Sequence, residues 1–130
     1  MPQRTRIPPL SPFEEQAGFT RALRACNRIV VSGTVGVEAD GSAAAEAGAQ
    51  ADRCFALIRE HIEYLGGRMD EVIRVRMFVT DIADADAVSA AFTRALGPVR
   101  PTGTLVAIAA LYRPEWKVEI EAEAVVGDDG

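Results

Sequence analysis

Lysine and histidine are scarce in this chain of 130 residues, and each shortage narrows what the protein can do. Lys117 is the only lysine and His61 the only histidine. The 14 basic residues are outnumbered by 19 acidic ones, which gives a formal net charge of −5. Because binding to a phosphate backbone needs clustered Lys and Arg, we expect no nucleic-acid partner. A single histidine also argues against a histidine-based metal site and leaves one possible histidine base.

Cysteine and long apolar runs are also in short supply. Cys26 and Cys54 lack the spacing of a metal-binding motif. Cys54 falls on the apolar face of an expected helix, so we expect a buried free thiol in a reducing compartment. The opening MPQRTRIPPL has no apolar core of a secretory signal, and no apolar run reaches the roughly 18 residues of a membrane span. We therefore expect a cytoplasmic protein without a membrane partner.

Several common motifs of enzymes are missing as well. The segment SGTVGVEADG lacks the G-x-x-x-x-G-K-[ST] pattern of a phosphate-binding loop. The chain contains neither G-x-G-x-x-G nor the G-x-S-x-G turn of a serine hydrolase. Nucleotide binding and serine hydrolysis are thus not indicated.

With 48% apolar residues, the chain is long enough to bury one core, and we expect a single domain over 1–130. We assign 1–16 to an N-terminal strand and loop, because PPLSPF holds three prolines in six residues, and 127–130 to a flexible tail. The segments 19–25 and 28–35 predict a hairpin that turns at Cys26 and Asn27.

The rest of the chain alternates between helical and strand periods. Apolar residues spaced by four and three predict a helix over 44–65. Alternation predicts a strand over 72–79, and a second helix begins at Asp81 or Asp84 and runs to about Leu96. Two final strands follow, 103–111 and 116–126. This order predicts an α+β fold, a mixed β-sheet with two helices on one face.

The 103–111 strand conflicts with that arrangement. It is apolar on both faces, which is typical of a strand buried on both sides, whereas the two helices cover only one side of the sheet. A second copy of the chain would supply the missing cover, so we expect an oligomer.

The last strand carries a stripe of acidic residues on its polar face. Glu121 and Glu123 are expected to pair with Arg74 and Arg76 of the 72–79 strand. Glu119 has two interpretations: a member of the same charged stripe, or a partly buried carboxylate whose raised pKa suits it to hold a water. His61 lies between the inward Ile58 and Ile62, and we expect it to be partly exposed on the helix surface.

Four stretches in this order, NRIVVSGT, VIRVRMFVTDIAD, RPTGTLVAIAAL and KVEIEAEAVV, resemble the reactive-intermediate deaminase (RidA) family, also called YjgF-like or L-PSP endoribonuclease-like. The resemblance implies a chorismate-mutase-like fold in a homotrimer whose sheets face inward. It implies small-molecule clefts between subunits, hydrolysis of enamines and imines to ammonia and a 2-keto acid, and no metal or cofactor.

The functional positions of the family carry over unevenly. Where active members have an arginine that holds the substrate carboxylate, in R-P-A-R-[ST], this chain has Gly103, followed by Thr104. The family's water-directing glutamate matches Glu119, and its serine matches Ser32. Its tyrosine matches Phe19 and its helix-two asparagine matches Ser89, so both of those functional groups are lost.

Three questions about the site stay open at this point. Trp116 and Tyr112 flank the loop YRPEW and either line a larger cleft or pack between subunits. The candidates to replace the lost guanidinium are Arg21, Arg100 and Arg113. Ser32 either contacts a ligand or bonds a neighbouring backbone group.

Two function classes are therefore compatible with the sequence. The first is a divergent enamine or imine hydrolase with Glu119 directing water, inefficient on 2-iminoacids. The second is a non-catalytic trimer that binds a metabolite in the same cleft or assists other proteins. Ribonuclease activity is less favoured, because the chain is acidic and lacks a histidine pair.

Overall fold

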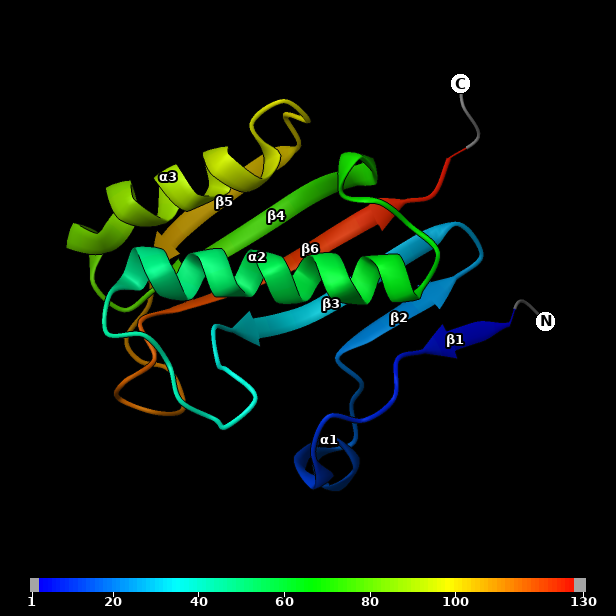
Figure 1. Ribbon diagram of the computed structural model, residues 1–130, viewed down its shortest axis with the longest axis horizontal. Coiled ribbons are helices and arrows are strands. Elements are labelled where there is room, and N and C mark those ends of the chain that lie inside the picture. Colours follow the sequence, from blue (N-terminus) through cyan, green and yellow to red (C-terminus); the bar gives the residue numbers. More distant parts are fainter. Residues whose placement is uncertain (1–2, 128–130) are drawn as a thin grey trace.

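A six-stranded mixed sheet forms the centre of the protein in the computed structural model, which describes residues 3–127 (Figure 1). The strands lie in the order β1-β2-β3-β6-β4-β5; β4 and β5 are parallel and the other pairs are antiparallel. The elements are β1 (Arg4–Arg6), α1 (Pro12–Ala17), β2 (Ala22–Ala25), β3 (Arg28–Val35), α2 (Ala47–Tyr64), η1 (Met69–Glu71), β4 (Val72–Val79), η2 (Ile82–Asp84), α3 (Ala85–Leu96), β5 (Thr102–Ala107) and β6 (Val118–Val125).

Helices α2 and α3 lie side by side across one face of the sheet (Figure 1). The predicted α+β fold with two helices on one face is thus confirmed, as is the hairpin that joins β2 to β3. No helix formed by residues 3–127 lies on the opposite face of the sheet, which we call the open face.

The N-terminal region contains the expected strand, β1, but forms a short helix where a loop was expected. A short helix, α1, begins directly after Ser11, inside the proline-rich segment. Ser11 and Glu14 form a capping box and Pro12 takes the first helical position, where its missing N–H is no loss. Most of the expected tail at 127–130 lies outside the described residues.

The core fills the space between the helices and the sheet. On β6, Val118, Ile120, Ala122 and Ala124 are at most 3% exposed and face α2 and α3. The acidic residues between them, Glu119, Glu121 and Glu123, face the opposite way and are half-buried on the open face.

Within one chain the 103–111 segment lacks the second cover that we expected another copy of the chain to supply. β5 ends at Ala107 and is an edge strand that pairs only with β4, so one of its edges and its open face have no cover. Val106 is 42% exposed in consequence. Leu105 packs against the core on the helix-covered side of β5, and nothing in the described part of one chain covers the other side.

Two buried side chains of α2 can be compared with their predictions. His61 is only 7% exposed, which corrects the expectation of a partly exposed residue; the broad contact face of α2 includes it, and burial lowers its pKa. Cys54 is fully buried, as predicted, with its thiol 3.2 Å from the carbonyl oxygen of Thr34. Burial raises the pKa of the Cys54 thiol to about 12.

Gln50 of α2 joins the helix to the chain that leads into β6. Its amide nitrogen donates to the carbonyl oxygens of Ala44 at 2.7 Å and Glu115 at 2.9 Å, and its oxygen accepts the amide of Lys117 at 2.9 Å. Gln50 is 1% exposed, and a side chain at Gly36 would collide with its backbone. One side chain therefore fixes two loops against the first turns of α2.

Gln50→Leu is expected to lower the free energy of unfolding by about 2 kcal/mol, because the substitution removes three hydrogen bonds at a buried position. Urea denaturation followed by circular dichroism measures the change. Gln16→Leu on exposed α1 is the matched control, and it should change stability by less than about 0.5 kcal/mol. Equal effects of the two substitutions would contradict this role for Gln50.

Candidate functional site

A β-bulge interrupts the pairing of β3 with β6 at Ser32 and Gly33. The register shifts between Val31, which lies opposite Ala122, and Thr34, which lies opposite Ile120. Bulges bend a strand and redirect the side chains next to them. Here the bulge lies on the open face beside Glu119.

The carboxyl group of Glu119 lies directly over Gly33. A Cβ atom at position 33 would be 2.7 Å from the Glu119 Cδ and 2.8 Å from its Oε2, which is closer than real contacts allow. Position 33 must therefore lack a side chain for the carboxylate to lie there. Sequence analysis assigned no role to Gly33, although the Ser-Gly dipeptide inside a β-branched strand was a signal of a close approach.

The environment of Glu119 favours its protonated form. Burial raises the pKa of its carboxyl group, the neighbouring Glu121 raises it further, and Arg21 lowers it. Among the described residues, no side chain or amide donates a hydrogen bond to the carboxylate. A half-buried carboxyl group with a raised pKa and open hydrogen-bonding positions is suited to hold a water or a ligand and to exchange a proton with it.

Ser32 bonds the backbone, one of the two alternatives that the sequence left open. Its hydroxyl donates to the carbonyl oxygen of Thr20 at 2.7 Å, and its amide donates to the carbonyl oxygen of Arg21 at 2.9 Å. Ser32 thereby fixes the chain before β2 against the bulge.

Phe19 and Arg21 occupy that chain segment. The Arg21 guanidinium carbon is 5.5 Å from the centre of the Phe19 ring. The Arg21 Nε is 3.6 Å from Oε1 of the buried Glu14. Phe19 also contacts Phe13 of α1, with ring centres 5.8 Å apart in an edge-to-face arrangement.

The open face next to the bulge is hollowed into a depression of about 350 Å³, which is lined by Val30, Val31, Ser32, Gly33, Arg74, Arg76, Glu121, Ala122 and Glu123. The predicted pairing of Arg76 with Glu121 is confirmed at 2.7 Å. Arg74 lies opposite Glu123 in the strand register, but the carboxylate of Glu123 pairs with Arg28 at 3.4 Å.

The remaining predicted residues lie away from Glu119. A Cβ atom at Gly103 would be 3.4 Å from the Phe92 ring, so position 103 faces α3 on the helix-covered side of the sheet. Ser89 is exposed on α3, on that same side. Thr104 lies opposite Arg76 in the register and is exposed. One chain therefore does not bring Gly103 and Ser89 together with Glu119.

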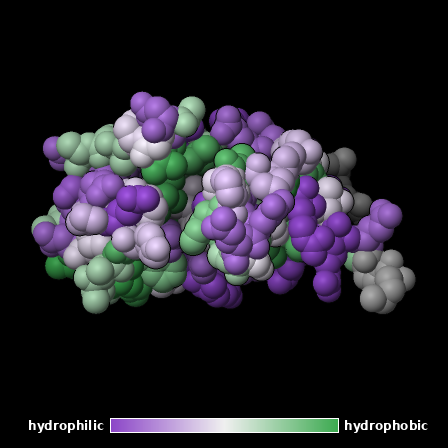
Figure 2. Space-filling model, turned by 90° about the horizontal axis from the view of Figure 1, so that it is seen from below, coloured by the Kyte–Doolittle hydropathy of each residue, from purple (hydrophilic) through white to green (hydrophobic). Residues whose placement is uncertain are grey.

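The aromatic residues of the YRPEW loop separate. Tyr112 is 84% exposed, with its ring centre 6.2 Å from that of Phe13. Trp116 is half-buried, and the Arg113 guanidinium carbon lies 5.8 Å from the centre of its ring. Figure 2 shows this surface from below, with hydrophobic and hydrophilic residues interspersed.

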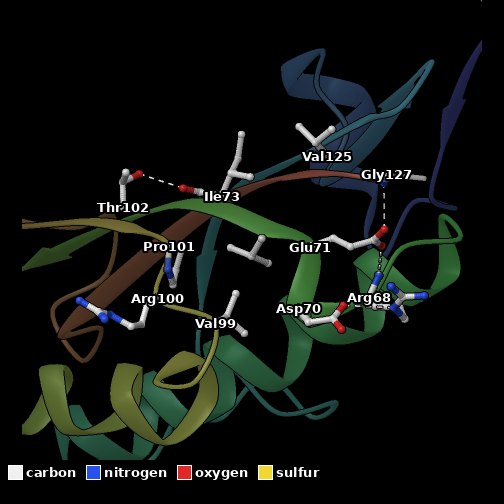
Figure 3. Close-up of a pocket in the computed structure, with 11 residues that line it drawn as sticks. Arg68, Asp70, Glu71, Ile73, Val99, Arg100, Pro101, Thr102, Val125 and Gly127 are labelled. Atoms are coloured by element: carbon white, nitrogen blue, oxygen red, sulfur yellow. Dashed lines mark hydrogen bonds and ion pairs between the residues drawn. The ribbon is translucent and has the colours of Figure 1, made fainter. Parts of the chain in front are cut away.

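A second, wider depression of about 620 Å³ lies where β4 and β5 begin (Figure 3). Arg100, Pro101 and Thr102 line it from one side and Asp70 and Glu71 from the other. Arg100 adopts a left-handed backbone with φ of 55°. None of the predicted catalytic or substrate-binding residues lines this depression, so Arg100 belongs to a different region from Glu119.

Comparison with known proteins places the chain in a family. The family model described as Endoribonuclease L-PSP matches residues 11–126. A solved member of the YjgF/YER057c/UK114 family from Mycobacterium tuberculosis has a TM-score of 0.88 at 33% identity, over 95% of this chain and all of that one. RidA from the Antarctic bacterium Psychrobacter has a TM-score of 0.78 at 25% identity, over 84% of this chain and 89% of that one.

An uncharacterized protein of Streptomyces coelicolor is 32% identical over 94% of this chain and 92% of its own length. The chain belongs to the endoribonuclease L-PSP family, the RidA/YjgF family that the sequence motifs indicated. No helix in the described part is long and apolar enough to cross a membrane.

Gly33→Ala is expected to move the Glu119 carboxyl group away from the bulge without unfolding the protein, because the added methyl group meets the end of a flexible side chain. The displaced carboxyl becomes more hydrated, so its raised pKa should fall toward the ordinary value. Carbon-detected NMR titration of the glutamate carboxyls measures this. Gly127→Ala is the matched control, because a Cβ atom there meets nothing within 4 Å. An unchanged Glu119 pKa in Gly33→Ala would contradict the assigned contact.

Proposed function

We propose that the protein is a small-molecule hydrolase of the deaminase type, acting on an enamine, imine or related nitrogen compound with Glu119 as the residue that directs water. The observation that carries this proposal is the half-buried Glu119 carboxyl group above Gly33, which accepts no hydrogen bond from the described residues. The raised pKa of Glu119 is closer to neutral pH than that of an ordinary glutamate. A general base works best when its pKa is close to the pH at which the enzyme acts.

The chemistry needs one water and no redox partner. Glu119 takes a proton from water while the oxygen attacks the imine carbon, and a tetrahedral carbinolamine forms. Glu119 gives that proton to the nitrogen. It then takes the proton of the new hydroxyl as the carbonyl forms and delivers it to the leaving nitrogen, so the carbon–nitrogen bond breaks and ammonia and a carbonyl compound leave. Glu119 is unchanged at the end, so each imine and each water yield one carbonyl and one ammonia.

We propose further that the complete site lies between subunits of a homotrimer. Glu119 and Ser32 are on the open face, whereas Gly103 and Ser89 are on the helix-covered side. A second copy that covers the open face would bring Glu119 and Ser32 of one chain against Gly103 and Ser89 of its neighbour. The uncovered apolar segment of β5 supports such an assembly, because its exposed surface would be removed from water.

Gly103 limits the substrate. It offers no guanidinium at the position where active relatives are expected to hold a carboxylate. A charge-assisted contact of that kind is worth roughly 1.5–3 kcal/mol, or about ten- to a hundredfold in rate. Small 2-iminoacids formed from serine or threonine should therefore be poor substrates.

The proposal predicts a trimer with weak, Glu119-dependent activity on an imine generated in place by an amino-acid oxidase. Light scattering coupled to size exclusion gives the mass, and a coupled assay gives the rate of ammonia release. Glu119→Gln should lower that rate by about 10²- to 10⁴-fold, the usual contribution of a general base. Glu15→Gln on exposed α1 is the control. A monomer at micromolar concentration, or equal rates for Glu119→Gln and the parent, would reject this function.

Gly103→Arg should fold and should raise the rate on small 2-iminoacids by about ten- to a hundredfold. The new Cβ meets Phe92 at an ordinary contact distance, and Gly103 is not among the glycines with positive φ. Gly103→Gln, which has a long side chain without charge, should show no such gain. Dissociation of both variants, measured by light scattering, would instead show that the glycine is required for packing between chains.

A non-catalytic binding protein is the second candidate, and one observation favours it. The Ser32 hydroxyl is already engaged by the carbonyl of Thr20, and Phe19 has no hydroxyl, so few polar groups beside Glu119 are directed at a ligand. In that case Glu119→Gln changes ligand affinity, and neither variant nor parent releases ammonia above the background rate.

A further inference from the structure

Arg21 directly precedes β2, at the end of that strand that lies beside the bulge. Besides burial, the positive charge of Arg21 lowers the pKa of His61 on α2, so Arg21 is within electrostatic reach of the helix-covered side. Its carbonyl oxygen accepts the amide of Ser32, which places it beside the bulge that carries Gly33. Its positive charge also acts on the Glu119 carboxyl.

The guanidinium of Arg21 is held from two directions. Its Nε is 3.6 Å from Oε1 of Glu14, which is 2% exposed, and its carbon is 5.5 Å from the centre of the Phe19 ring. Glu14 is itself fixed, because its other oxygen accepts the amides of Leu10 at 2.8 Å and Ser11 at 2.7 Å. The position of the guanidinium is therefore set before any ligand arrives.

The hydrogen-bonding capacity of this guanidinium is unused. Among the described residues, no acceptor takes a hydrogen bond from Arg21, although the group carries five N–H donors in a planar fork. The buried Oε1 of Glu14 also has no hydrogen-bond partner in the described part of the chain. The Arg21 side chain is 25% exposed, so a ligand can reach it.

The other two arginines that could replace the lost guanidinium are less well placed. Arg113 lies over the Trp116 ring, and Arg100 lines the separate depression of Figure 3. Neither acts on the pKa of Glu119, whereas Arg21 does.

We propose that Arg21 binds the carboxylate of the ligand, and that the apolar part of the ligand lies along Phe19 and Phe13. A guanidinium fork binds a carboxylate through two parallel hydrogen bonds. The ring of Phe19 is 38% exposed and that of Phe13 is 49% exposed, so both can contact an apolar substituent. The substrate class is then a carboxylate-bearing imine or enamine whose apolar side chain is larger than the methyl or ethyl group of the serine- and threonine-derived compounds. This inference rests on the proposed function in one respect: the imine carbon of the ligand is taken to lie at Glu119.

Binding of a stable carbonyl product tests the proposal without catalysis. Isothermal titration calorimetry compares 4-methyl-2-oxopentanoate with its uncharged methyl ester. The parent should bind the acid about ten- to a hundredfold more tightly than the ester, and Arg21→Gln should abolish that preference. Arg21→Lys keeps the charge but not the fork, and should retain only part of it. Arg59→Gln, at an exposed arginine of α2 paired with Glu63, is the matched control and should bind like the parent.

Arg21→Gln leaves the buried Glu14 without its ion pair, so a second variant separates folding from binding. Glu14→Gln/Arg21→Gln removes both charges together. It should fold and should still show no preference for the acid. Recovery of the preference in the double variant would overturn the proposal, because the loss in the single variant would then come from a displaced Glu14. Equal affinities of the parent for acid and ester would also overturn it.

Glu119→Gln distinguishes this inference from the proposed function. If it leaves ammonia release unchanged while Arg21 still determines the preference for the acid, the hydrolase proposal fails and the anion site stands. If Glu119→Gln abolishes hydrolysis while Arg21→Gln binds the acid as the parent does, the anion site fails and the hydrolase proposal stands.

Discussion

Strict alternation along β6 is the constraint on which the rest of the structure depends. This strand pairs with β3 on one side and with β4 on the other. The side chains on its two faces therefore lie at the centre of the core on one side of the sheet and at the centre of the open face on the other. One face supplies four small or branched side chains to the core beneath α2 and α3. The other must then present three glutamates to the open face. A shift of one residue would bury the glutamates and expose the core, so register and site are fixed together.

Three carboxylates in a row on a sheet repel one another, and the structure compensates for them unequally. Arg76 neutralises Glu121 and Arg28 neutralises Glu123. Glu119 has no such ion pair within the described residues, and only the more distant Arg21 offsets its charge. Glu119 thus differs from its two neighbours in lacking an ion pair within residues 3–127 and in having a pKa that burial raises. The same stripe therefore contains two glutamates in ion pairs and one without an ion pair among the described residues.

The parts of the fold that depend on periodicity could be predicted from the sequence. The spacing of apolar residues gave α2, β4 and β6 within a few positions, because one-sided burial imposes a period on the sequence. The helix α1 was missed because three prolines indicated a loop and the capping pair Ser11 and Glu14 was not weighed. The second cover of β5 stays a prediction, because apolar composition indicates burial without saying which chain provides it.

The candidate site was predictable only in part, for a related reason. Glu119 and Ser32 could be placed by motif, and both lie at the bulge. The approach of Glu119 to Gly33 depends on a two-residue irregularity that leaves no periodic signal. The same holds for Arg21, whose neighbours Glu14 and Phe19 are brought to it by a turn after α1. Long-range contacts that involve irregular backbone are decided by packing, and the sequence pattern contains little information about them.

Gln50 restricts the motion of the loop that precedes β6. Its side chain bonds Glu115 and Lys117, so the chain entering β6 is tethered at two successive points to a buried helix. The segment that can move on the fast timescales typical of loops is thereby shortened to the few residues around Tyr112. The exposed Tyr112 ring, whose centre is 6.2 Å from that of Phe13, therefore belongs to a loop that is anchored to α2 at the end leading into β6.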